Sequence, residues 1–371
     1  MTNPNISRIM IVGACARAAA QSAHQAGYQV ITADLFADSD TCQVANCESL
    51  LDYPHEIPKF VSKYAPDAVF ITGALENYPS ILRRISNISW LLAPPISTIT
   101  SIRSPFQLKA ILQADGFDFP EITDDQVPNY GKWIAKPYLS AAGHHIHVVT
   151  TGTECPAGYY LQEFVPGRPM SVSYLLQSNT ITILGTSELM QGDVAAEEAF
   201  QFYGAITCSL ADHHRLLLEL GNLLRKIGLR GLTGVDFILT DENHIIILEV
   251  NPRYTATMEL YEHLWKQPLI ALHVAAFQDT DMAAAAAAPL KVAGKQIIYA
   301  KQSVMITKRL MSQFHNTAAD QDLELADIPH PGTSITRGHP ILTLFGTALD
   351  VDSLKQRLRI GATSILQHTL D

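Results

Sequence analysis

The sequence predicts a mixed α/β and α+β protein made of three consecutive units, and three observations support this fold class. Residues 7–99 alternate short apolar runs with helical patterns, which is typical of a parallel α/β domain. Two β-branched runs at 234–239 and 245–250 flank a turn-forming Asp-Glu-Asn sequence, which predicts a β-hairpin. Six alanines closed by Pro289 interrupt the pattern and indicate a connector. The predicted units are residues 1–100, 101–288 and 289–371.

Four apolar runs in the first unit are predicted to be strands. They are residues 8–12, 28–33, 68–72 and 89–93, with a helix over 14–26 after the first. The turn from Gly13 to Arg17 lacks the G-x-G-x-x-G spacing of dinucleotide-binding folds, so a dinucleotide oxidoreductase is not indicated. Ligands of open α/β sheets bind at the carboxyl ends of the strands. Arg17, Glu76 and Asn77 are therefore candidate substrate contacts, with ordinary polar strand ends as the alternative.

The second unit begins with one predicted helix within residues 101–120, which ends near Gly116. Four predicted strands follow, at residues 132–136, 159–165, 171–176 and 180–184. An amphipathic helix is predicted after them, at residues 213–227. A loop of small residues, Ser140 to Gly143, comes directly after the first of these strands. Small residues let backbone N–H groups approach phosphate oxygens, so this loop is a candidate phosphate contact.

The predicted hairpin brings two carboxylates face to face. If residues 241–244 form its loop, Thr240 pairs with Ile245, and counting outward places Asp236 opposite Glu249. The Cβ atoms of directly opposed residues lie roughly 4.5–5.5 Å apart, where like charges repel each other. A cation between the two carboxylates would remove this repulsion.

The same face of the hairpin carries an amide. Side chains alternate along a strand, so Asn251 shares the face of Glu249. Oxygen ligands of this kind suit Mg²⁺ or Mn²⁺. The sequence therefore predicts a divalent metal site at Asp236, Glu249 and Asn251, followed by the cation of Arg253. The alternative is a partly exposed hairpin with scattered charges.

Asp236 and the run Glu249-Val-Asn251-Pro-Arg253 resemble the metal-binding end of the ATP-grasp superfamily. The resemblance implies an ATP-grasp fold with an N-terminal parallel α/β domain and a small C-terminal β-rich domain. It also implies ATP and Mg²⁺ (or Mn²⁺) as cofactors and a hinge between two lobes near residues 162–165. Among the members of the superfamily, the chain looks most similar to carboligase-like proteins such as tyramine–glutamate ligases.

The resemblance also implies roles for individual residues. Lys136 would bind the ATP phosphates, and Arg253 would stabilise the acyl phosphate or the departing phosphate. The remaining implied ATP contacts are Ser140 and Gly143 at the phosphates and Gln162, Glu163 and Val165 at the adenine.

Several positions depart from the pattern that is usual in the superfamily. His144-His145 occupy positions where Arg-Gly is frequent in the superfamily. Pro105 lies near the position of a frequent basic residue, and Pro169 lies near the position of a frequent ribose-binding glutamate. His145 and His147 share a strand face, which leaves a zinc site as an alternative to a polar loop.

The resemblance implies an ATP-dependent ligase that activates a carboxylate as an acyl phosphate for attack by an amine. A carboxylase that uses bicarbonate, as in biotin carboxylase or the purine ligases, is one alternative. A nucleotide-binding protein that has lost turnover is another, and the two prolines and the histidines keep it open. The expected partners are small carboxylate and amine substrates.

Composition narrows the class of protein further. The chain has 371 residues and a formal net charge of −10, which argues against a nucleic-acid surface. No apolar run approaches the roughly 18–20 residues of a membrane span, and no leader pattern is present at the start. The five cysteines show no C-x-x-C spacing and are predicted to be free thiols in the cytoplasm. A homodimer is the default expectation for oligomeric state.

Overall fold

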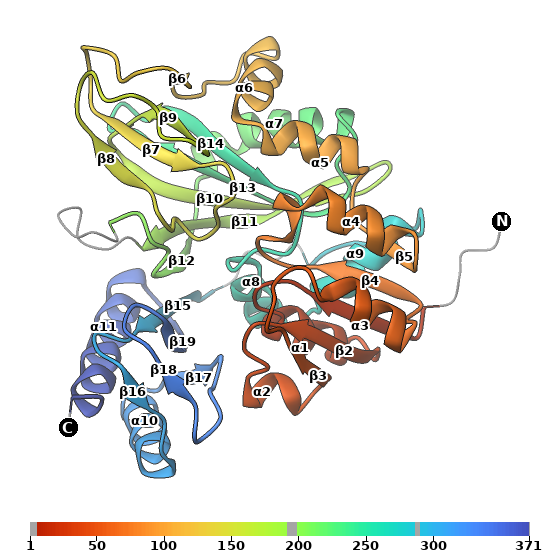
Figure 1. Cartoon of the computed structure of the whole chain (residues 1–371), viewed down its shortest axis with the longest axis vertical. Helices are drawn as coiled ribbons and strands as arrows, with labels where there is room; N and C mark the ends of the chain where they lie inside the picture. Colours follow the sequence, from red (N-terminus) through yellow and green to blue (C-terminus); the bar gives the residue numbers. More distant parts are fainter. Residues whose placement is uncertain (1–5, 191–198, 286–289, 371) are drawn as a thin grey trace.

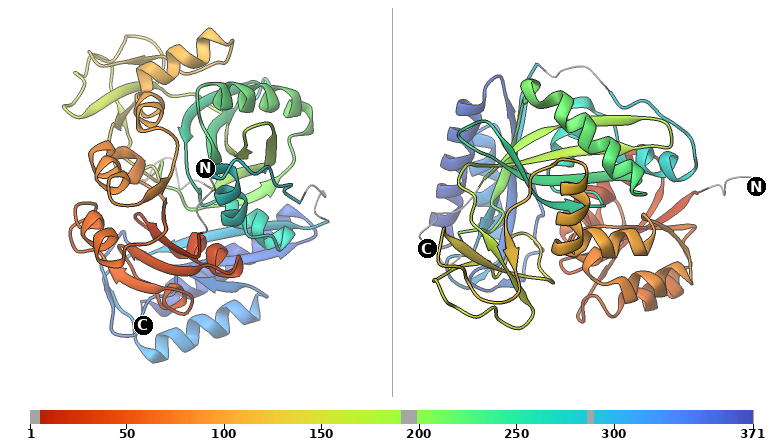
Figure 2. Two further views of the ribbon diagram at one scale, coloured as in Figure 1. Left: turned by 90° about the vertical axis from the view of Figure 1, so that its right-hand side faces the viewer. Right: turned by 90° about the horizontal axis from the view of Figure 1, so that it is seen from above.

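The computed structural model describes residues 6–190, 199–285 and 290–370 (Figure 1). The N-terminal part (red) and the C-terminal part (blue) lie side by side below the central part (yellow to green), and Figure 2 shows the same arrangement from two further directions. Among the helices of the described ranges, none is long and apolar enough to cross a membrane.

The N-terminal sheet has five parallel strands in the order β3-β2-β1-β4-β5, which confirms the predicted parallel α/β architecture. The edge strand β3 was not predicted, because its sequence Asn-Cys-Glu-Ser is polar and none of its residues is buried. The strands are β1 (Arg8–Val12), β2 (Gln29–Asp34), β3 (Asn46–Ser49), β4 (Ala68–Ile71) and β5 (Trp90–Leu92). The helices are α1 (Arg17–Gln25), α2 (Ser39–Cys42), α3 (Ile57–Tyr64), the 3₁₀ turn η1 (Leu75–Asn77), α4 (Pro79–Ser86) and α5 (Ile96–Arg103).

Two helices replace the single helix predicted within residues 101–120. α5 ends at Arg103, and α6 runs Pro105–Ala114. Ser104 between them has φ −84° and ψ 113°, because a proline ring disfavours the helical conformation of the residue before it. The break leaves Arg103 at the end of α5, where it lines the cavity described below.

A small antiparallel sheet follows α6, with the strand order β6-β9-β7-β8. Lys136 lies on β7, as predicted, and is paired with Tyr160 of β9. The strands are β6 (Ile122–Thr123), β7 (Trp133–Pro137), β8 (His147–Val149) and β9 (Tyr159–Glu163).

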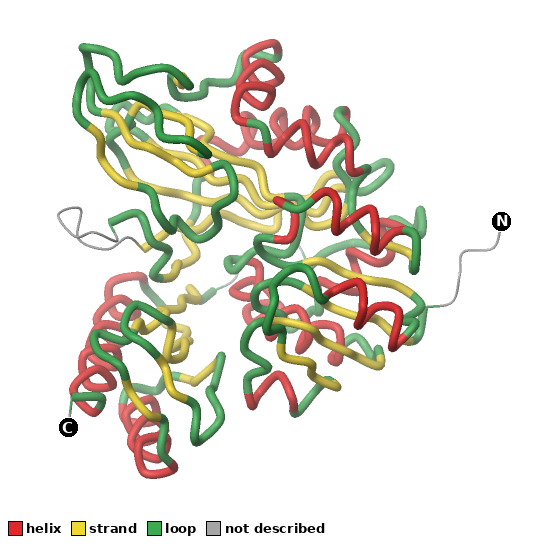
Figure 3. The backbone as a smooth tube through the Cα atoms, viewed as in Figure 1, coloured by secondary structure: helices red, strands yellow, loops and turns green. Residues whose placement is uncertain are grey.

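The largest sheet has eight strands in the order β14-β13-β10-β11-β12-β15-β19-β17, and it runs from the central part into the C-terminal part (Figure 3). Its strands are β10 (Arg168–Leu176), β11 (Ile181–Met190), β12 (Gly204–Cys208), β13 (Gly231–Leu239), β14 (Ile245–Asn251), β15 (Val292–Tyr299), β17 (Glu324–Ala326) and β19 (Pro340–Ala348). The accompanying helices are η2 (Ala211–His213), α7 (His214–Lys226), α8 (Met258–Trp265), α9 (Leu269–Phe277), α10 (Lys308–Asp320) and α11 (Val351–His368). A two-stranded ribbon of β16 (Val304–Met305) and β18 (Ser334–Ile335) completes the C-terminal part.

Pairing between β12 and β15 crosses the predicted boundary between the second and third units. Gly204 lies opposite Gln296 in this antiparallel pair. The strands after residue 290 therefore extend the central sheet. Residues 286–289 of the predicted connector lie outside the described residues, and the division of the chain at 288/289 stays a prediction.

The hairpin of β13 and β14 has a different register at its turn from the predicted one. Leu239, and not Thr240, pairs with Ile245. Further along the hairpin, Asp236 nevertheless lies opposite Glu249, as predicted.

A β-bulge reconciles these two observations. The register shifts by one residue between Asp236 and Phe237, so that Leu248 is the extra residue on β14. A bulge bends its strand and redirects the side chains beside it. Here it restores the opposition of Asp236 and Glu249, which both line the cavity described below.

A buried charge cluster joins the three parts of the chain. Arg17 of α1 donates from Nε to Asp327 at 2.8 Å and from NH2 to Glu259 of α8 at 2.9 Å. Lys295 of β15 also donates to Glu259, at 2.9 Å. Burial by itself would raise the pKa of Glu259, but Arg17 and Lys295 hold that pKa well below its usual range. The guanidinium of Arg17, predicted as a substrate contact, is thus occupied by carboxylates of the protein.

Glu262 of α8 is a second buried carboxylate, at a junction between helices. It accepts hydrogen bonds from the Ser22 hydroxyl of α1, from the backbone N–H of Leu269 and from the Tyr254 hydroxyl, the last at 2.5 Å. Burial raises the pKa of Glu262 to about 7.

We expect Glu262→Gln to change how stability depends on pH. The folded protein holds a proton on Glu262 up to about pH 7, whereas the unfolded chain releases it near pH 4.5. The stabilisation from this group is therefore present below the unfolded pKa and is lost as the pH rises through the folded pKa. Glutamine stays neutral, so this pH-dependent loss is absent from the variant. The unfolding free energy of the variant, measured by urea denaturation, should therefore rise relative to that of the native protein between about pH 5 and about pH 8. A difference that does not change with pH would contradict a protonated Glu262.

Candidate functional site

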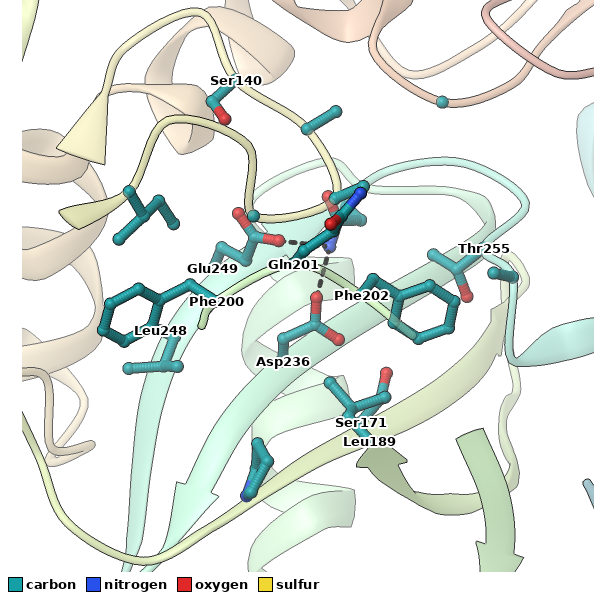
Figure 4. A pocket seen from close by; sticks show the side chains of 18 of the residues that line it. Ser140, Ser171, Leu189, Phe200, Gln201, Phe202, Asp236, Leu248, Glu249 and Thr255 are labelled. Atoms are coloured by element: carbon teal, nitrogen blue, oxygen red, sulfur yellow. Dashed lines mark hydrogen bonds between the residues drawn. The ribbon is translucent and has the colours of Figure 1, made fainter. Parts of the chain in front are cut away.

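A cavity of about 470 Å³ lies where the small sheet, the eight-stranded sheet and the N-terminal part meet. Figure 4 shows Asp236 and Glu249 at its centre. The predicted site residues that line it are Arg17, Lys136, Ser140, Gly143, Gln162, Val165, Asp236, Glu249, Asn251 and Arg253. Glu163 is not among the lining residues. Residues more than a hundred positions apart in the sequence thus face one space.

The side chain of Asn251 joins the two opposed carboxylates. Its Nδ2 donates to Asp236 Oδ2 at 3.0 Å and to Glu249 Oε1 at 3.3 Å, the two dashed lines in Figure 4. The amide N–H groups of Asn251 place a positive partial charge between these carboxylates. A cation in this position would interact with both more strongly than a neutral amide does.

The donor set fits Mg²⁺ or Mn²⁺, because carboxylate and amide oxygens are the ligands that these hard cations prefer. Ser171 of β10 lies opposite Asp236 in the sheet, and its buried Oγ has no hydrogen-bond partner in the part of the chain that the structure describes. An orphaned hydroxyl beside two carboxylates is the kind of group that a bound ion or its water satisfies.

The two carboxylates have opposite pKa shifts. Burial, together with the charge of Glu249, raises the pKa of Asp236 to about 7. Burial would also raise the pKa of Glu249, but Arg103 and Lys136 outweigh it and lower that pKa to about 2. In the metal-free pair, Asp236 therefore holds a proton more readily than Glu249, and binding of a metal would favour the release of that proton.

Lys136, on β7 of the small sheet, is a partly buried cation that lines the cavity. Its Nζ donates to Gln162 Oε1 at 3.2 Å and lies 5.8 Å from the centre of the Tyr160 ring. Burial by itself would lower the pKa of Lys136, but Tyr160 and Glu249 raise it above the usual value. Lys136 is therefore charged and available to neutralise an anion in the cavity.

The loop of small residues is held from two sides. Ser140 O accepts a hydrogen bond from Asn77 Nδ2 at 3.0 Å, so Asn77, predicted as a substrate contact, fixes the loop. On the other side, Phe202 N–H donates to Ala142 O at 2.9 Å. Gly143 has φ +76°, and a Cβ on it would lie 1.8 Å from Phe200 O. Only glycine permits this close approach.

We expect Gly143→Ala to displace the loop and weaken nucleotide binding on the order of tenfold, which corresponds to about 1.4 kcal/mol. Gly152→Ala is the matched control, because Gly152 also has a positive φ, +78°, but open space around it. Both variants carry the same backbone strain, and only Gly143→Ala adds the clash with Phe200. Titration of each variant with MgADP compares the affinities. Equal affinities would contradict a role of this loop in binding.

The predicted adenine contacts are only partly available. The backbone N–H of Glu163 donates to Glu121 O at 2.8 Å, and that of Phe164 donates to Lys132 O at 2.7 Å. Both groups are therefore used within the protein. Gln162 and Val165 line the cavity and remain the candidates at this end.

Arg253 is anchored by Glu76 and Asn251. Its Nε donates to Glu76 Oε1 at 2.7 Å, and its NH2 donates to Asn251 Oδ1 at 3.3 Å. Glu76, predicted as a substrate contact, is 1% exposed and serves here to orient the guanidinium. Arg253 thus lies directly beside the predicted metal ligands.

Arg103 and Gln201 are cavity residues that were not assigned from the sequence. Arg103 approaches Glu249 Oε2 at 3.6 Å and donates to Asn77 Oδ1 at 2.9 Å. Its position just before Pro105, near the place of a basic residue in the superfamily, was the available signal. Gln201 also lines the cavity, and a lone glutamine in a sequence carries no comparable signal.

The histidines of the loop do not form a metal site. His144, His145 and His147 are exposed, and His147 Nδ1 lies 3.2 Å from the backbone oxygen of His145. Within the described ranges, no group of three or more His, Cys, Asp or Glu residues is arranged to hold a metal ion. The zinc alternative therefore has no support: His144 and His145 lie in the polar loop, and His147 begins β8.

Comparison with known proteins identifies the central part of the chain. Residues 105–257 match the model of the ATP-grasp domain. An uncharacterized protein of Methanocaldococcus jannaschii is 20% identical over 292 residues, which cover 75% of this chain and 69% of that protein.

Solved structures share the architecture at low sequence identity. Biotin carboxylase of Campylobacter jejuni has a TM-score of 0.74 at 13% identity, covering 99% of this chain and 96% of that one. N5-carboxyaminoimidazole synthetase of Staphylococcus aureus has a TM-score of 0.73 at 13% identity, with 98% and 99% covered. An L-amino acid ligase of Bacillus licheniformis has a TM-score of 0.72 at 12% identity, with 98% of each chain covered. These likenesses and the sheet arrangement show that the chain has the ATP-grasp fold, and residues 105–257 match the ATP-grasp domain.

Proposed function

We propose that this protein is an ATP- and Mg²⁺-dependent ligase that activates a carboxylate as an acyl phosphate for attack by an amine. The observation that carries the proposal is the opposed pair Asp236 and Glu249 in one cavity with Lys136, Arg103 and Arg253. Transfer of a phosphoryl group requires that its negative charge be neutralised by metal ions and cationic side chains. Carboxylates that bind a metal, surrounded by three cations, meet this requirement.

Each cavity residue has a proposed role. Asp236, Glu249 and Asn251 would hold Mg²⁺, which supplies charge neutralisation at the phosphates when bound. Lys136 would bind the phosphates as a point charge, and the backbone of Ser140 and Gly143 would cover them. Gln162 and Val165 would contact the adenine.

The proposed reaction has two steps. A carboxylate oxygen of the substrate attacks the γ-phosphorus of ATP, the bond to the bridging oxygen breaks, and ADP leaves. The amine nitrogen then attacks the acyl carbon, the bond from that carbon to the phosphate oxygen breaks, and inorganic phosphate and a proton are released. We assign Arg253 to the departing phosphate, because Glu76 fixes its guanidinium beside Asn251.

A carboxylase that uses bicarbonate is the alternative, favoured by the likeness of the fold to biotin carboxylase. The likeness to an L-amino acid ligase supports the proposed reaction in the same way. Measurement of ADP release distinguishes the ligase from the carboxylase. Release that requires both a carboxylate and an amine supports the ligase, and release with bicarbonate in place of the carboxylate supports the carboxylase. Binding of MgATP without turnover on any acceptor would indicate lost activity.

Mg²⁺-dependent stabilisation by adenine nucleotides is the first test. A ligand that binds only the native state raises the unfolding free energy by about 2.7 kcal/mol at a hundredfold excess over Kd. We expect ATP or ADP with Mg²⁺ to raise the thermal midpoint, the same nucleotides with EDTA to raise it less, and NAD to leave it unchanged. A midpoint that no adenine nucleotide shifts would overturn the nucleotide site and the proposed function with it.

A further inference from the structure

Gln201 is a buried polar side chain whose hydrogen-bonding groups have no partner in the protein. It is 2% exposed and lines the cavity, yet neither Oε1 nor Nε2 forms a hydrogen bond in the part of the chain that the structure describes. Burying an amide without partners is costly, so such groups are rare in folded proteins. A ligand in the cavity is the partner that would satisfy both atoms.

The backbone around Gln201 is fixed on three sides. Phe202 N–H donates to Ala142 O at 2.9 Å, in the small-residue loop. Tyr203 N–H donates to Met190 O at 3.1 Å, and Ile297 N–H donates to Tyr203 O at 2.8 Å. Gln201 is thus held at a set position between the loop and the strands β11 and β15.

Apolar side chains from the same neighbouring segments line this end of the cavity. Leu189, Phe202 and Ile297 are half-buried and face it. Figure 4 shows Phe200 and Leu248 on one side of the Asp236–Glu249 pair and Phe202 on the other. Phe202 therefore lies across the carboxylates from Leu248, next to the small-residue loop that accepts its backbone N–H.

The neutral amide of Gln201 is satisfied by a ligand group that both donates and accepts hydrogen bonds. Its Oε1 only accepts hydrogen bonds, and its Nε2 only donates them. A plain amine leaves Nε2 without an acceptor, and a plain carboxylate leaves Oε1 without a donor. An α-amino acid presents an ammonium group and a carboxylate side by side and satisfies both atoms.

We propose that Gln201, together with Leu189, Phe202 and Ile297, forms the subsite for the second substrate, and that this subsite takes an α-amino acid with an apolar side chain. This proposal rests on the proposed function, since it assumes a nucleotide in the same cavity. Gln201 forms hydrogen bonds with the ammonium and carboxylate groups of the amino acid, and the three apolar side chains contact its apolar side chain.

The test uses the full chain loaded with MgADP and four matched probes in titration calorimetry. L-leucine carries both head groups on an apolar body. 3-Methylbutylamine lacks the carboxylate, 4-methylpentanoate lacks the amino group, and L-serine lacks the apolar body. We expect L-leucine to bind at least tenfold more tightly than the other three. Equal binding of the four probes, or no binding of L-leucine, would overturn the assigned substrate class.

Variants separate this subsite from the nucleotide site. Gln201→Leu should keep the thermal stabilisation by MgADP and lose the preference for L-leucine over the amine and the carboxylate. Ile297→Thr should keep that stabilisation and narrow the difference between L-leucine and L-serine. Unchanged probe affinities in Gln201→Leu would overturn the role of Gln201. Failure of MgADP to stabilise the native protein would instead contradict the proposed function, so the two failures are distinguishable.

Discussion

Glu249→Gln should lose the Mg²⁺-dependent part of nucleotide binding and lower ATP turnover by at least about a hundredfold. Loss of a single charge-stabilising group at a reacting centre typically costs on the order of 10²–10³ in rate. The variant keeps the shape of the side chain and leaves only Asp236 to neutralise a divalent cation. The thermal shift with MgADP, compared with ADP in EDTA, measures the metal-dependent part without any knowledge of the acceptor.

Glu242→Gln is the control for this experiment. Glu242 is exposed at the turn of the same hairpin and does not line the cavity. We expect it to bind MgADP like the native protein. If Glu249→Gln retains the full metal-dependent shift, the assignment of Asp236, Glu249 and Asn251 as metal ligands is wrong.

Arg17→Met should destabilise the protein by about 3–5 kcal/mol, because it leaves buried carboxylates without their cation. Arg17 is 3% exposed and forms ion pairs with Glu259 and Asp327, which belong to different parts of the chain. Lys295 remains beside Glu259, so Asp327 is the carboxylate most affected. The midpoint of urea denaturation reports the loss.

Arg215→Met is the matched control, because it removes the same charge from an exposed pair. Arg215 is 92% exposed and Glu219 is 53% exposed, and exposed pairs of this spacing contribute only about 0.3–0.5 kcal/mol. A similar denaturation midpoint in the two variants would contradict the view that the Arg17 cluster holds the three parts together.

The hairpin of β13 and β14 shows which structural features the local sequence predicts and which it does not. Its β-branched runs predicted two strands, and alternation placed Asp236, Glu249 and Asn251 on one face, as the structure has them. The predicted pairing of Thr240 with Ile245 was wrong by one residue, because no residue pattern in the sequence indicates the bulge at Leu248. The bulge follows from how the strand packs in the sheet, which is a tertiary effect.

The helix break and the edge strand show two other limits. Pro105 could have ended the predicted helix, since the residue before a proline avoids the helical conformation. β3 has no apolar pattern, because it lies at an edge and none of its four residues is buried. Only its pairing with β2 defines it as a strand.

By itself, the sequence determined the parallel α/β start of the chain, the strand with Lys136, the hairpin with its carboxylates and the resemblance to ATP-grasp proteins. These features depend on residues that are close together in the chain, where periodicity and turn chemistry act. The tertiary structure alone decided what Arg17 and Gln201 do. Arg17 meets carboxylates 242 and 310 residues away in the sequence, and these occupy its guanidinium. Gln201 becomes a candidate ligand contact only because burial leaves its amide without a partner, and burial is a property of the folded chain.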